Sequence, residues 1–448
     1  MPRRVKRSGM EVSMRKPEDM QVVVLMGGLG TRLSQYTKQC PKPLVDVCGK
    51  PFFHYQLTLM AKQGFRRFLF LIGYKAEMIE EYFGDGSAYG VSITYCYDGK
   101  ELLGTGGAVR RAFPYLEDDF LLMYGDSFMD IDFEESLYRY EEGKKQGAKA
   151  LMTVLLNYGK YDKSNVIMRD GKLVLYDKKN PVPEMNAIDY GVCIYDKSVF
   201  ASFEENEKFD VAVVQNALSL TGQIVPHVVT KRFYEIGSPD SLMEFTEYVK
   251  HRFLEAHPAV FLDRDGVINE IVFNEDTEQL DSPLCVKEFR FLPYVEEALH
   301  ILQEKGYYIF VVTNQPAAAK GKTTLCKLYE INTHMLLTLE EQGIYIEEVK
   351  MCPHTDKKAP RTKLPELVHK CDCRKPQTGL FMKIADKYCL DRENSYMVGD
   401  SYTDVEAGRK FGVKTVFLGN YKCDVCAKLE YNHPDFIFGD LYSFAKSL

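Results

Sequence analysis

Short apolar runs alternate with amphipathic stretches along this chain, and this alternation limits the folds that the chain can adopt. Gln21–Met26 and Arg67–Ile72 have the pattern of buried strands, and Phe52–Gln63 and Ala76–Phe83 have the spacing of helices. Strands that are connected through helices normally form a parallel sheet with helices on both faces. The sequence therefore predicts an α/β fold.

The same alternation begins again past the midpoint of the chain. Strands are predicted at Ala259–Leu262 and Tyr308–Val312, with a helix over Val295–Lys305 between them, and a long helical pattern, Ser241–Glu255, precedes them. A chain of 448 residues is also long for one hydrophobic core. We therefore expect two doubly wound, mostly parallel-sheet domains. Their expected bounds are 20–256 and 257–448, after a disordered basic tail at 1–19.

Charge and hydropathy exclude several classes of partner. The formal net charge is −7, whereas a protein that binds nucleic acid is usually basic. No apolar stretch approaches the roughly 20 residues that span a bilayer, and Met1–Lys16 has no apolar core of the kind found in a secretory signal. Twelve cysteines in such a chain favour reduced thiols or metal ligands over disulfides. We expect a cytoplasmic protein that binds neither nucleic acid nor a membrane.

A glycine-rich segment follows the first predicted strand. Its sequence is Gly27-Gly28-Leu29-Gly30-Thr31-Arg32-Leu33, and Pro41-Lys42-Pro43 comes soon after it. Glycines let backbone N–H groups approach a phosphate closely, and cationic side chains beyond them balance its charge. Glycines alone also fit a strand-to-helix turn without a ligand. The added Arg32 and Lys42 favour a site for a nucleoside triphosphate.

A second polar constellation follows strands of the C-terminal half. Asp263 and Asp265 lie at the end of one predicted strand, and Thr313 and Asp400 each follow another, with Lys375 between these two in sequence. Because ligands of open α/β sheets gather at the carboxyl ends of the strands, these side chains can converge. The two aspartates fit a metal site or a nucleophile and acid pair, and Asp-Arg-Asp-Gly alone also fits a surface turn.

Two closely spaced pairs of cysteine and histidine residues lie in the C-terminal half. Cys352-Pro353-His354 and Cys371-Asp372-Cys373 together offer three sulfurs and one imidazole. This set suits a tetrahedral, structural zinc ion with no open position, and the alternative is a coincidence of reduced thiols. A further pair, Cys423 and Cys426, has no visible partner ligands, so ordinary thiols are favoured there.

The N-terminal motifs together resemble the sugar-1-phosphate nucleotidyltransferases, over roughly Gln21 to Lys250. The matching pieces, besides the glycine-rich segment and Pro-Lys-Pro, are Gly104-Thr105-Gly106-Gly107-Ala108, Gly125-Asp126, Asp177-Lys178, Asp189-Tyr190-Gly191 and Glu235-Ile236-Gly237. The resemblance implies that Arg32 binds the triphosphate, Lys42 neutralises charge at the α-phosphorus and Lys178 meets the sugar phosphate. The residues implied to line the nucleotide are Gly27, Gly28, Gly30, Thr31, Gly104, Thr105, Gly106 and Gly107.

The implied reaction needs cations more than acid–base groups. An oxygen of a sugar 1-phosphate attacks the α-phosphorus of the triphosphate, and pyrophosphate leaves. The nucleophile is already ionised, so no general base is required. The resemblance places Mg²⁺ on Asp126 and Glu235. Many relatives carry aspartate at the Glu235 position, and nearby Asp240 is an alternative ligand.

The C-terminal constellation resembles the haloacid dehalogenase-type phosphatases. By that resemblance Asp263 is the nucleophile, Asp265 is the general acid and then base, and Thr313 bonds to the phosphoryl oxygens. Lys375 would balance charge, and Asp404 would steady this lysine or the metal shell. The implied ligands of Mg²⁺ are Asp263, Asp400 and the carbonyl of Asp265.

The Cys-x-His and Cys-x-Cys pairs narrow the subfamily. They lead directly into Arg374-Lys375-Pro376, and this arrangement resembles the heptose-bisphosphate phosphatases and their histidinol-phosphatase relatives. Arg374, Asn314 and Gln315 match that group and are implied to bind substrate. Pro316-Ala317 departs from the Ser-Gly that is usual there, which puts the substrate contacts of this loop in question.

Together the two resemblances imply a bifunctional enzyme of nucleotide-activated heptose synthesis. One domain would remove the 7-phosphate of D-glycero-D-manno-heptose 1,7-bisphosphate, and the other would transfer a nucleotidyl group, most simply GMP from GTP, to the 1-phosphate. The product would feed lipopolysaccharide or S-layer glycans. The alternatives are another sugar-phosphate or histidinol-phosphate phosphatase joined to a different pyrophosphorylase, or a non-catalytic sugar-nucleotide sensor in the N-terminal half. Oligomeric state and channelling are not predicted.

Overall fold

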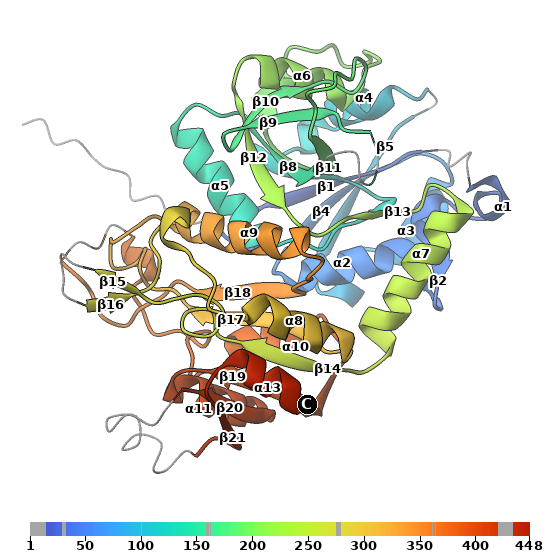
Figure 1. Cartoon of the computed structure of the whole chain (residues 1–448). Coiled ribbons are helices and arrows are strands. Elements are labelled where there is room, and N and C mark those ends of the chain that lie inside the picture. Colours follow the sequence, from blue (N-terminus) through green and yellow to red (C-terminus); the bar gives the residue numbers. More distant parts are fainter. Residues whose placement is uncertain are drawn as a thin grey trace, which may run out of the picture. The chain divides into compact units, whose positions relative to one another are not determined.

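The computed structural model of the chain describes most of its length, shown in Figure 1. The described residues are 15–28, 33–99, 101–157, 161, 163–274, 279–360, 362, 364–419 and 433–448. The expected tail up to residue 14, the pair Cys423 and Cys426, and the site residues Gly30, Thr31 and Arg32 lie outside them. The chain forms two compact units, Met1–Leu242 and Met243–Leu448. Among the described helices, none is long and apolar enough to cross a membrane.

The first unit is built on a nine-stranded mixed sheet. Its main path runs β10 (Lys172–Tyr176), β9 (Val166–Arg169), β11 (Ala187–Asp196), β6 (Asp119–Tyr124), β1 (Gln21–Met26), β4 (Arg67–Ile72) and β5 (Ser92–Tyr97). The other two strands are β8 (Ala150–Leu156), which pairs with β11, and β12 (Ile224–Val229), which pairs with β8. Strand β1 is parallel to β4 and β6, and β11 is antiparallel to β6, β8 and β9.

Helices of the first unit cover this sheet, and small strand pairs lie beside it. The helices are α1 (Ser34–Thr37), α2 (Phe52–Lys62), α3 (Ala76–Phe83), α4 (Gly104–Arg111), α5 (Phe133–Lys145) and α6 (Val211–Leu220). The small pairs are β2 (Asp46–Val47) with β3 (Lys50–Pro51), and β7 (Ser127–Phe128) with β13 (Tyr234–Glu235). Helix α5 packs on β8 and β12, and α6 packs on β10 (Figure 1). Helix α7 (Pro239–Val249) crosses the division between the units.

The second unit is built on a six-stranded sheet that is parallel throughout. Its order is β18 (Glu348–Cys352), β17 (Tyr308–Asn314), β14 (His257–Leu262), β19 (Leu390–Gly399), β20 (Lys414–Leu418) and β21 (Phe436–Phe438). The helices are α8 (Val295–Glu304), α9 (Leu325–Glu341), α10 (Gly379–Ala385), α11 (Tyr402–Phe411) and α13 (Leu441–Ser447). A two-stranded ribbon, β15 (Val272–Asn274) and β16 (Gln279–Asp281), follows β14.

The predicted α/β fold class is confirmed in both units. Strand β1 is buried on both faces, as a central parallel strand must be, and so is β14 from Ala259 onward. One antiparallel pair of the first sheet follows from turn chemistry. Asp170 and Gly171 join β9 to β10, with φ of 51° and 71°. An Asp-Gly pair with positive φ at both positions makes a tight hairpin, so β10 returns antiparallel to β9.

Candidate active sites and a cysteine–histidine cluster

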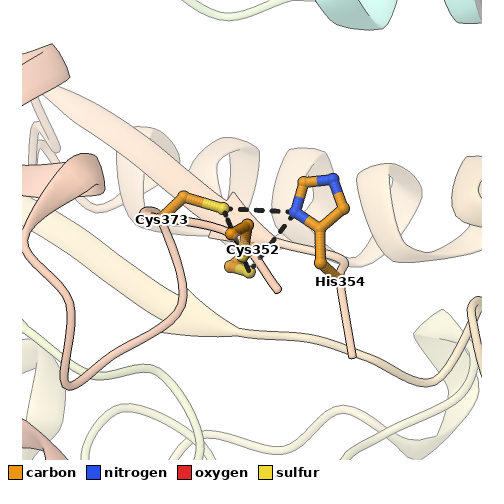
Figure 2. Close-up of side chains that lie close together, drawn as sticks. Cys352, His354 and Cys373 are labelled. Atoms are coloured by element: carbon orange, nitrogen blue, oxygen red, sulfur yellow. Dashed lines mark hydrogen bonds between the residues drawn. The ribbon is translucent and has the colours of Figure 1, made fainter. Parts of the chain in front are cut away.

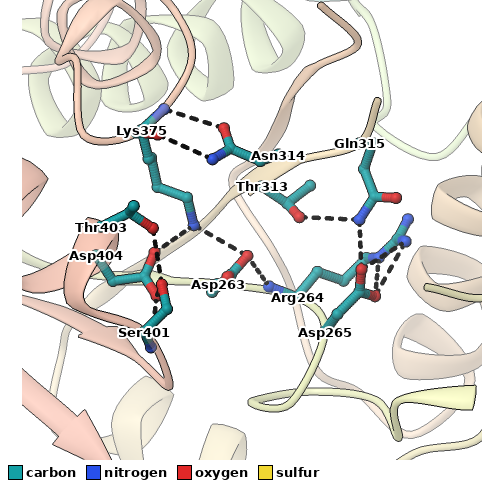
Figure 3. A network of polar contacts seen from close by, with 10 residues as sticks. All are labelled: Asp263, Arg264, Asp265, Thr313, Asn314, Gln315, Lys375, Ser401, Thr403 and Asp404. Atoms are coloured by element: carbon teal, nitrogen blue, oxygen red, sulfur yellow. Dashed lines mark hydrogen bonds and ion pairs between the residues drawn. The ribbon is translucent and has the colours of Figure 1, made fainter. Parts of the chain in front are cut away.

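The carboxyl edge of the second sheet gathers the predicted phosphatase residues. Asp263 follows β14, Thr313 lies near the end of β17, and Asp400 follows β19. Both β17 and β19 are parallel neighbours of β14, so these three positions share one edge. Figure 3 shows Asp263, Thr313 and Lys375 directed toward one another there.

Lys375 is the centre of this group. Its Nζ lies 3.0 Å from Asp263 Oδ1 and 2.7 Å from Asp404 Oδ1, and its side chain is 1% exposed. Asn314 holds the lysine backbone from both sides, since its Oδ1 accepts from Lys375 N at 3.0 Å and its Nδ2 donates to Lys375 O at 3.1 Å. Asp404 uses its other oxygen to cap α11, accepting from Ser401 N at 3.1 Å. The ammonium group is therefore fixed between two carboxylates.

Three carboxylates at the carboxyl edge of the second sheet form a candidate cation site. Ligand oxygens of Asp263, Asp400 and Asp404 lie within 4.8 Å of one another. Burial, together with the charge of Asp404, raises the pKa of Asp400 to about 7, and burial raises that of Asp263 to about 6 although Lys375 opposes the rise. Since Lys375 alone does not balance three carboxylates, a divalent cation with a preference for oxygen, such as Mg²⁺, fits the donor set.

Close packing explains a glycine of the Asp-Arg-Asp-Gly motif. Gly266 has φ of +79°, and a Cβ atom there would collide with the carboxylate of Asp400.

Asp265, one residue earlier, accepts a hydrogen bond at 2.6 Å from Gln315 Nε2, which also lies 3.1 Å from Thr313 Oγ1. Burial opposes ionisation of Asp265, but Arg264 and hydrogen bonds lower its pKa below the usual range.

The cysteine and histidine pairs form one cluster at the end of β18. Ligand atoms of Cys352, His354, Cys371 and Cys373 lie within 4.8 Å of one another, and three of the residues are labelled in Figure 2. Cys373 Sγ lies 3.2 Å from Cys352 Sγ, 3.3 Å from Cys371 Sγ and 3.2 Å from His354 Nδ1. These separations are too long for disulfides of about 2.05 Å and approach the roughly 3.8 Å edges of a tetrahedron with Zn–S bonds of about 2.3 Å. The donor set fits zinc.

This cluster is connected in two ways to the sheet edge that carries the predicted phosphatase residues. Cys373 is followed directly by Arg374 and Lys375, and Arg374 Nη1 donates to His354 O at 3.2 Å. On the other side, Gln315 N donates to Cys352 O at 2.7 Å. A metal ion at the cluster would therefore fix both the lysine and the glutamine that face the aspartates.

In the first unit, the structure pairs two of the predicted transferase residues. Lys42 Nζ lies 2.8 Å from Asp126 Oδ2, just beyond the end of β6. Glu235 lies opposite Ser127 in the β7–β13 pair, and Ile236 N donates to Asp126 O at 3.0 Å. The chain segments that carry Asp126 and Glu235 are thus adjacent. Asp240 lies in the first turn of α7.

The Gly104–Gly107 run begins α4 and packs against the chain itself. Gly106 N and Gly107 N donate to Phe209 O at 3.0 and 3.2 Å, and Thr105 Oγ1 accepts from Val211 N at 2.9 Å. A Cβ atom on Gly106 would collide with the Phe209 ring. Internal packing therefore accounts for this glycine.

Lys178 is exposed in the turn after β10, and no contact of it with Lys42 or Asp126 is recorded among the described residues.

Sequence reasoning missed one carboxylate beside the glycine-rich segment. Asp98 follows β5, and its Oδ2 occupies the space that side chains on Gly27 and Gly73 would need. Burial raises the pKa of Asp98, with Arg111 as the opposing charge. No hydrogen bond to its carboxylate is recorded within the described part of the chain. The sequence shows only that Asp98 follows a strand; its approach to Gly27 depends on the placement of β5.

Comparisons with known proteins cover both halves. The Nucleotidyl transferase family model matches residues 21–251, and the HAD-hydrolase-like model matches residues 372–444. D-glycero-alpha-D-manno-heptose 1-phosphate guanylyltransferase of Aneurinibacillus thermoaerophilus is 33% identical over 52% of this chain and 99% of that protein. D-glycero-beta-D-manno-heptose-1,7-bisphosphate 7-phosphatase of Salmonella typhi is 33% identical over 41% of this chain and 91% of that protein.

The solved structures that resemble the second half include a phosphatase. It is D,D-heptose 1.7-bisphosphate phosphatase from B. bronchiseptica with magnesium and phosphate, 25% identical over 42% of this chain and 97% of that one, with a TM-score of 0.34. This chain covers nearly the whole length of each of the two curated relatives. Together with the family models, they assign the first half to the nucleotidyl transferases and the second to the HAD-like hydrolases. The chain belongs to the nucleotidyl transferase family and joins to that domain a phosphatase domain of the HAD-like hydrolases.

Proposed function

We propose that this chain carries out two consecutive reactions of nucleotide-activated heptose synthesis. The second unit removes the 7-phosphate of D-glycero-D-manno-heptose 1,7-bisphosphate, and the first couples the resulting 1-phosphate to GMP from GTP with release of pyrophosphate. The observation that carries the phosphatase half is the placement of Lys375 against Asp263 and Asp404. The curated relatives of the two halves have names that describe these two activities.

In the phosphatase reaction Asp263 acts as the nucleophile. Its Oδ1 accepts from Arg264 N at 2.7 Å and faces Lys375, so Oδ2 is the oxygen that attacks phosphorus. Asp265 gives its proton to the leaving sugar oxygen and takes a proton from the water that then attacks the aspartyl-phosphate. The negative charge of the bound phosphate offsets the contacts that lower the pKa of Asp265 in the free site. Asp263, Asp400 and the Asp265 carbonyl would hold Mg²⁺, which would supply the positive charge that lets a carboxylate approach a phosphate.

In the transferase reaction the chain brings two anions together. Lys42 neutralises charge at the α-phosphorus. Its ion pair with Asp126 holds the ammonium group beside this proposed Mg²⁺ ligand, and Glu235 is the other proposed ligand. Arg32 and the rest of the glycine-rich segment bind the triphosphate. Because the sugar phosphate is already ionised, positioning and charge do the work.

Asp98 supports guanine as the base. Guanine presents two adjacent donors, N1–H and the 2-amino group, and one carboxylate can accept from both. Asp98 lies beside Gly27, and no hydrogen bond to its carboxylate is recorded among the described residues, although Arg111 attracts it electrostatically. Hydrogen bonds to charged groups contribute about 1.5–3 kcal/mol each, and Asp98→Asn replaces one acceptor oxygen by an amide donor, so it should lower kcat/KM for GTP at least ~10-fold. Glu101→Gln, at an exposed carboxylate nearby, is the matched control.

The relatives differ in the anomer that they name, alpha for the transferase and beta for the phosphatase. Hydrolysis of the 7-phosphate leaves the anomeric centre unchanged. We therefore propose that the phosphatase half accepts the α anomer, because only this product would suit the transferase half. Turnover of the two anomers of the bisphosphate tests this directly, and strict preference for β would refute it.

The test of the whole proposal uses the full chain. Pyrophosphate release is measured with heptose 1-phosphate and each of the four triphosphates, and phosphate release with the bisphosphate. Asp263→Asn should abolish phosphatase activity and leave nucleotidyl transfer intact. If no triphosphate gives pyrophosphate, the N-terminal half is better explained as a sugar-nucleotide sensor. If Asp263→Asn loses both activities, the two sites are not independent.

A further inference from the structure

Arg264, between the two catalytic aspartates, is a fully buried cation. Its side chain is 0% exposed, whereas the side chain of Asp265 is 15% exposed. Removing a guanidinium from water costs several kcal/mol unless it is paired and hydrogen-bonded. The recorded ion pair of Arg264 among the described residues is with Asp265, at 3.1 Å. This burial therefore requires a specific arrangement around the guanidinium.

The arrangement fixes the Asp265 carboxylate from two sides. Arg264 Nε donates to Asp265 Oδ1 at 3.1 Å, and Gln315 Nε2 donates to Asp265 Oδ2 at 2.6 Å. Figure 3 shows the carboxylate lying between these two groups. A carboxylate with donors at both oxygens cannot rotate freely, and proton transfer depends on such orientation.

Asn332 holds the far side of the guanidinium. It lies on α9, is 7% exposed, and its Oδ1 accepts from Arg264 Nη1 at 2.8 Å. Its Nδ2 faces Met351 Sδ at 3.8 Å. No contact between Asn332 and Asp263, Asp265 or Lys375 is recorded in the described part of the chain. The recorded contact of Asn332 that leads to the aspartates is its hydrogen bond with Arg264.

We propose that Arg264 and Asn332 are positioning residues of the phosphatase half. Asn332 sets the orientation of the guanidinium, and the guanidinium directs Asp265 toward the leaving sugar oxygen and, in the second step, toward the attacking water. This inference rests on the proposed role of Asp265 as acid and base. It concerns the orientation of that side chain.

The experiment is a double-mutant cycle in the full chain. Asn332→Leu replaces the amide by an apolar group of similar size, and it is made in the wild type and in Asp265→Asn. Rates of phosphate release from the bisphosphate are measured at saturation and, for slow variants, in single turnovers with excess enzyme. Lys387→Met is the control, since it also removes a buried polar contact of the same unit, the ion pair with Glu348 at 2.8 Å.

Asn332→Leu should lower kcat about 10- to 100-fold in the wild type, within the range of acid–base catalysis, with KM changed less than about threefold. In the Asp265→Asn background the further loss should be less than about twofold, because two residues that act through one group are not additive. Lys387→Met should leave kcat unchanged. Zinc content and the melting temperature of the second unit report whether each variant is folded.

Two results would overturn the inference. One is an unchanged kcat in Asn332→Leu, and the other is an equal loss in both backgrounds, which would mean general structural support. If Asn332→Leu does not fold, Arg264→Lys serves instead, because it keeps the charge but cannot contact Asp265 and Asn332 together. Full activity of Asp265→Asn would instead refute the proposed function of Asp265.

Discussion

Replacing Lys375 by methionine tests the electrostatic account of the phosphatase site. The substitution keeps most of the apolar stem and removes the ammonium group that lies 3.0 Å from Asp263 and 2.7 Å from Asp404. Both carboxylates would then remain at the site without their cation. Breaking a buried ion pair in this way costs about 3–5 kcal/mol. Without Mg²⁺ we expect a loss of stability of this size in the second unit.

The loss can be measured as a change in melting temperature. For a domain of this size, about 1 kcal/mol corresponds to roughly 2–4 °C, so Lys375→Met should lower the Tm of the second unit by about 6–20 °C. Calorimetry with and without GTP separates the two units, because GTP should stabilise only the first. Phosphate release should fall at least ~1000-fold, while nucleotidyl transfer is retained.

A second substitution distinguishes charge from packing. Lys375→Met combined with Asp404→Asn removes one of the two carboxylates that lost their partner, so part of the lost stability should return. Mg²⁺ should also stabilise Lys375→Met more than the wild type, since it replaces the missing charge. A Tm change below about 2 °C for Lys375→Met, or no recovery in the double variant, would refute the reasoning.

Two further predictions concern metal and packing. Cys371→Ser should lose about one equivalent of zinc in metal analysis, and an unchanged zinc content would rule out the proposed zinc site. Gly106→Ala should destabilise the first unit by about 1–3 kcal/mol in denaturant unfolding, because its Cβ atom would collide with Phe209. Gly439→Ala, which meets no atom within 4 Å, is the control, and equal effects of the two would contradict the packing argument.

The convergence of the predicted phosphatase residues could be read from the sequence because several of them follow strands, whereas their roles stay predictions. Asp263, Thr313 and Asp400 come directly at strand ends, and strand order alone makes such positions converge. Lys375 was found through its motif, and its partner Asp404 through its spacing from Asp400. The structure adds the reason for the geometry: Asp404 caps α11 with Oδ2 and faces Lys375 with Oδ1.

Other features could not be predicted because they depend on contacts between distant segments. Gly106 is required by Phe209, which lies 103 positions later in the chain, as the difference of the two residue numbers gives. The carboxylate of Asp98 reaches Gly27 and Gly73 because β5 pairs with β4, and this pairing is not evident from the sequence. Asn332, in the middle of a helical pattern, has no motif that distinguishes it from an ordinary polar helix residue.

The two sites use the same lysine–aspartate pairing in different surroundings, and salt should separate them. Lys42 and Asp126 are 12% and 27% exposed, whereas Lys375 and Asp404 are each 1% exposed. Dissolved ions screen exposed charges far more than buried ones. Between low and about 0.5 M KCl, kcat at saturating substrate should therefore fall more for nucleotidyl transfer than for phosphate release in the same preparation. Equal salt dependence of the two rates would mean that this difference in burial does not govern the charges that act in catalysis.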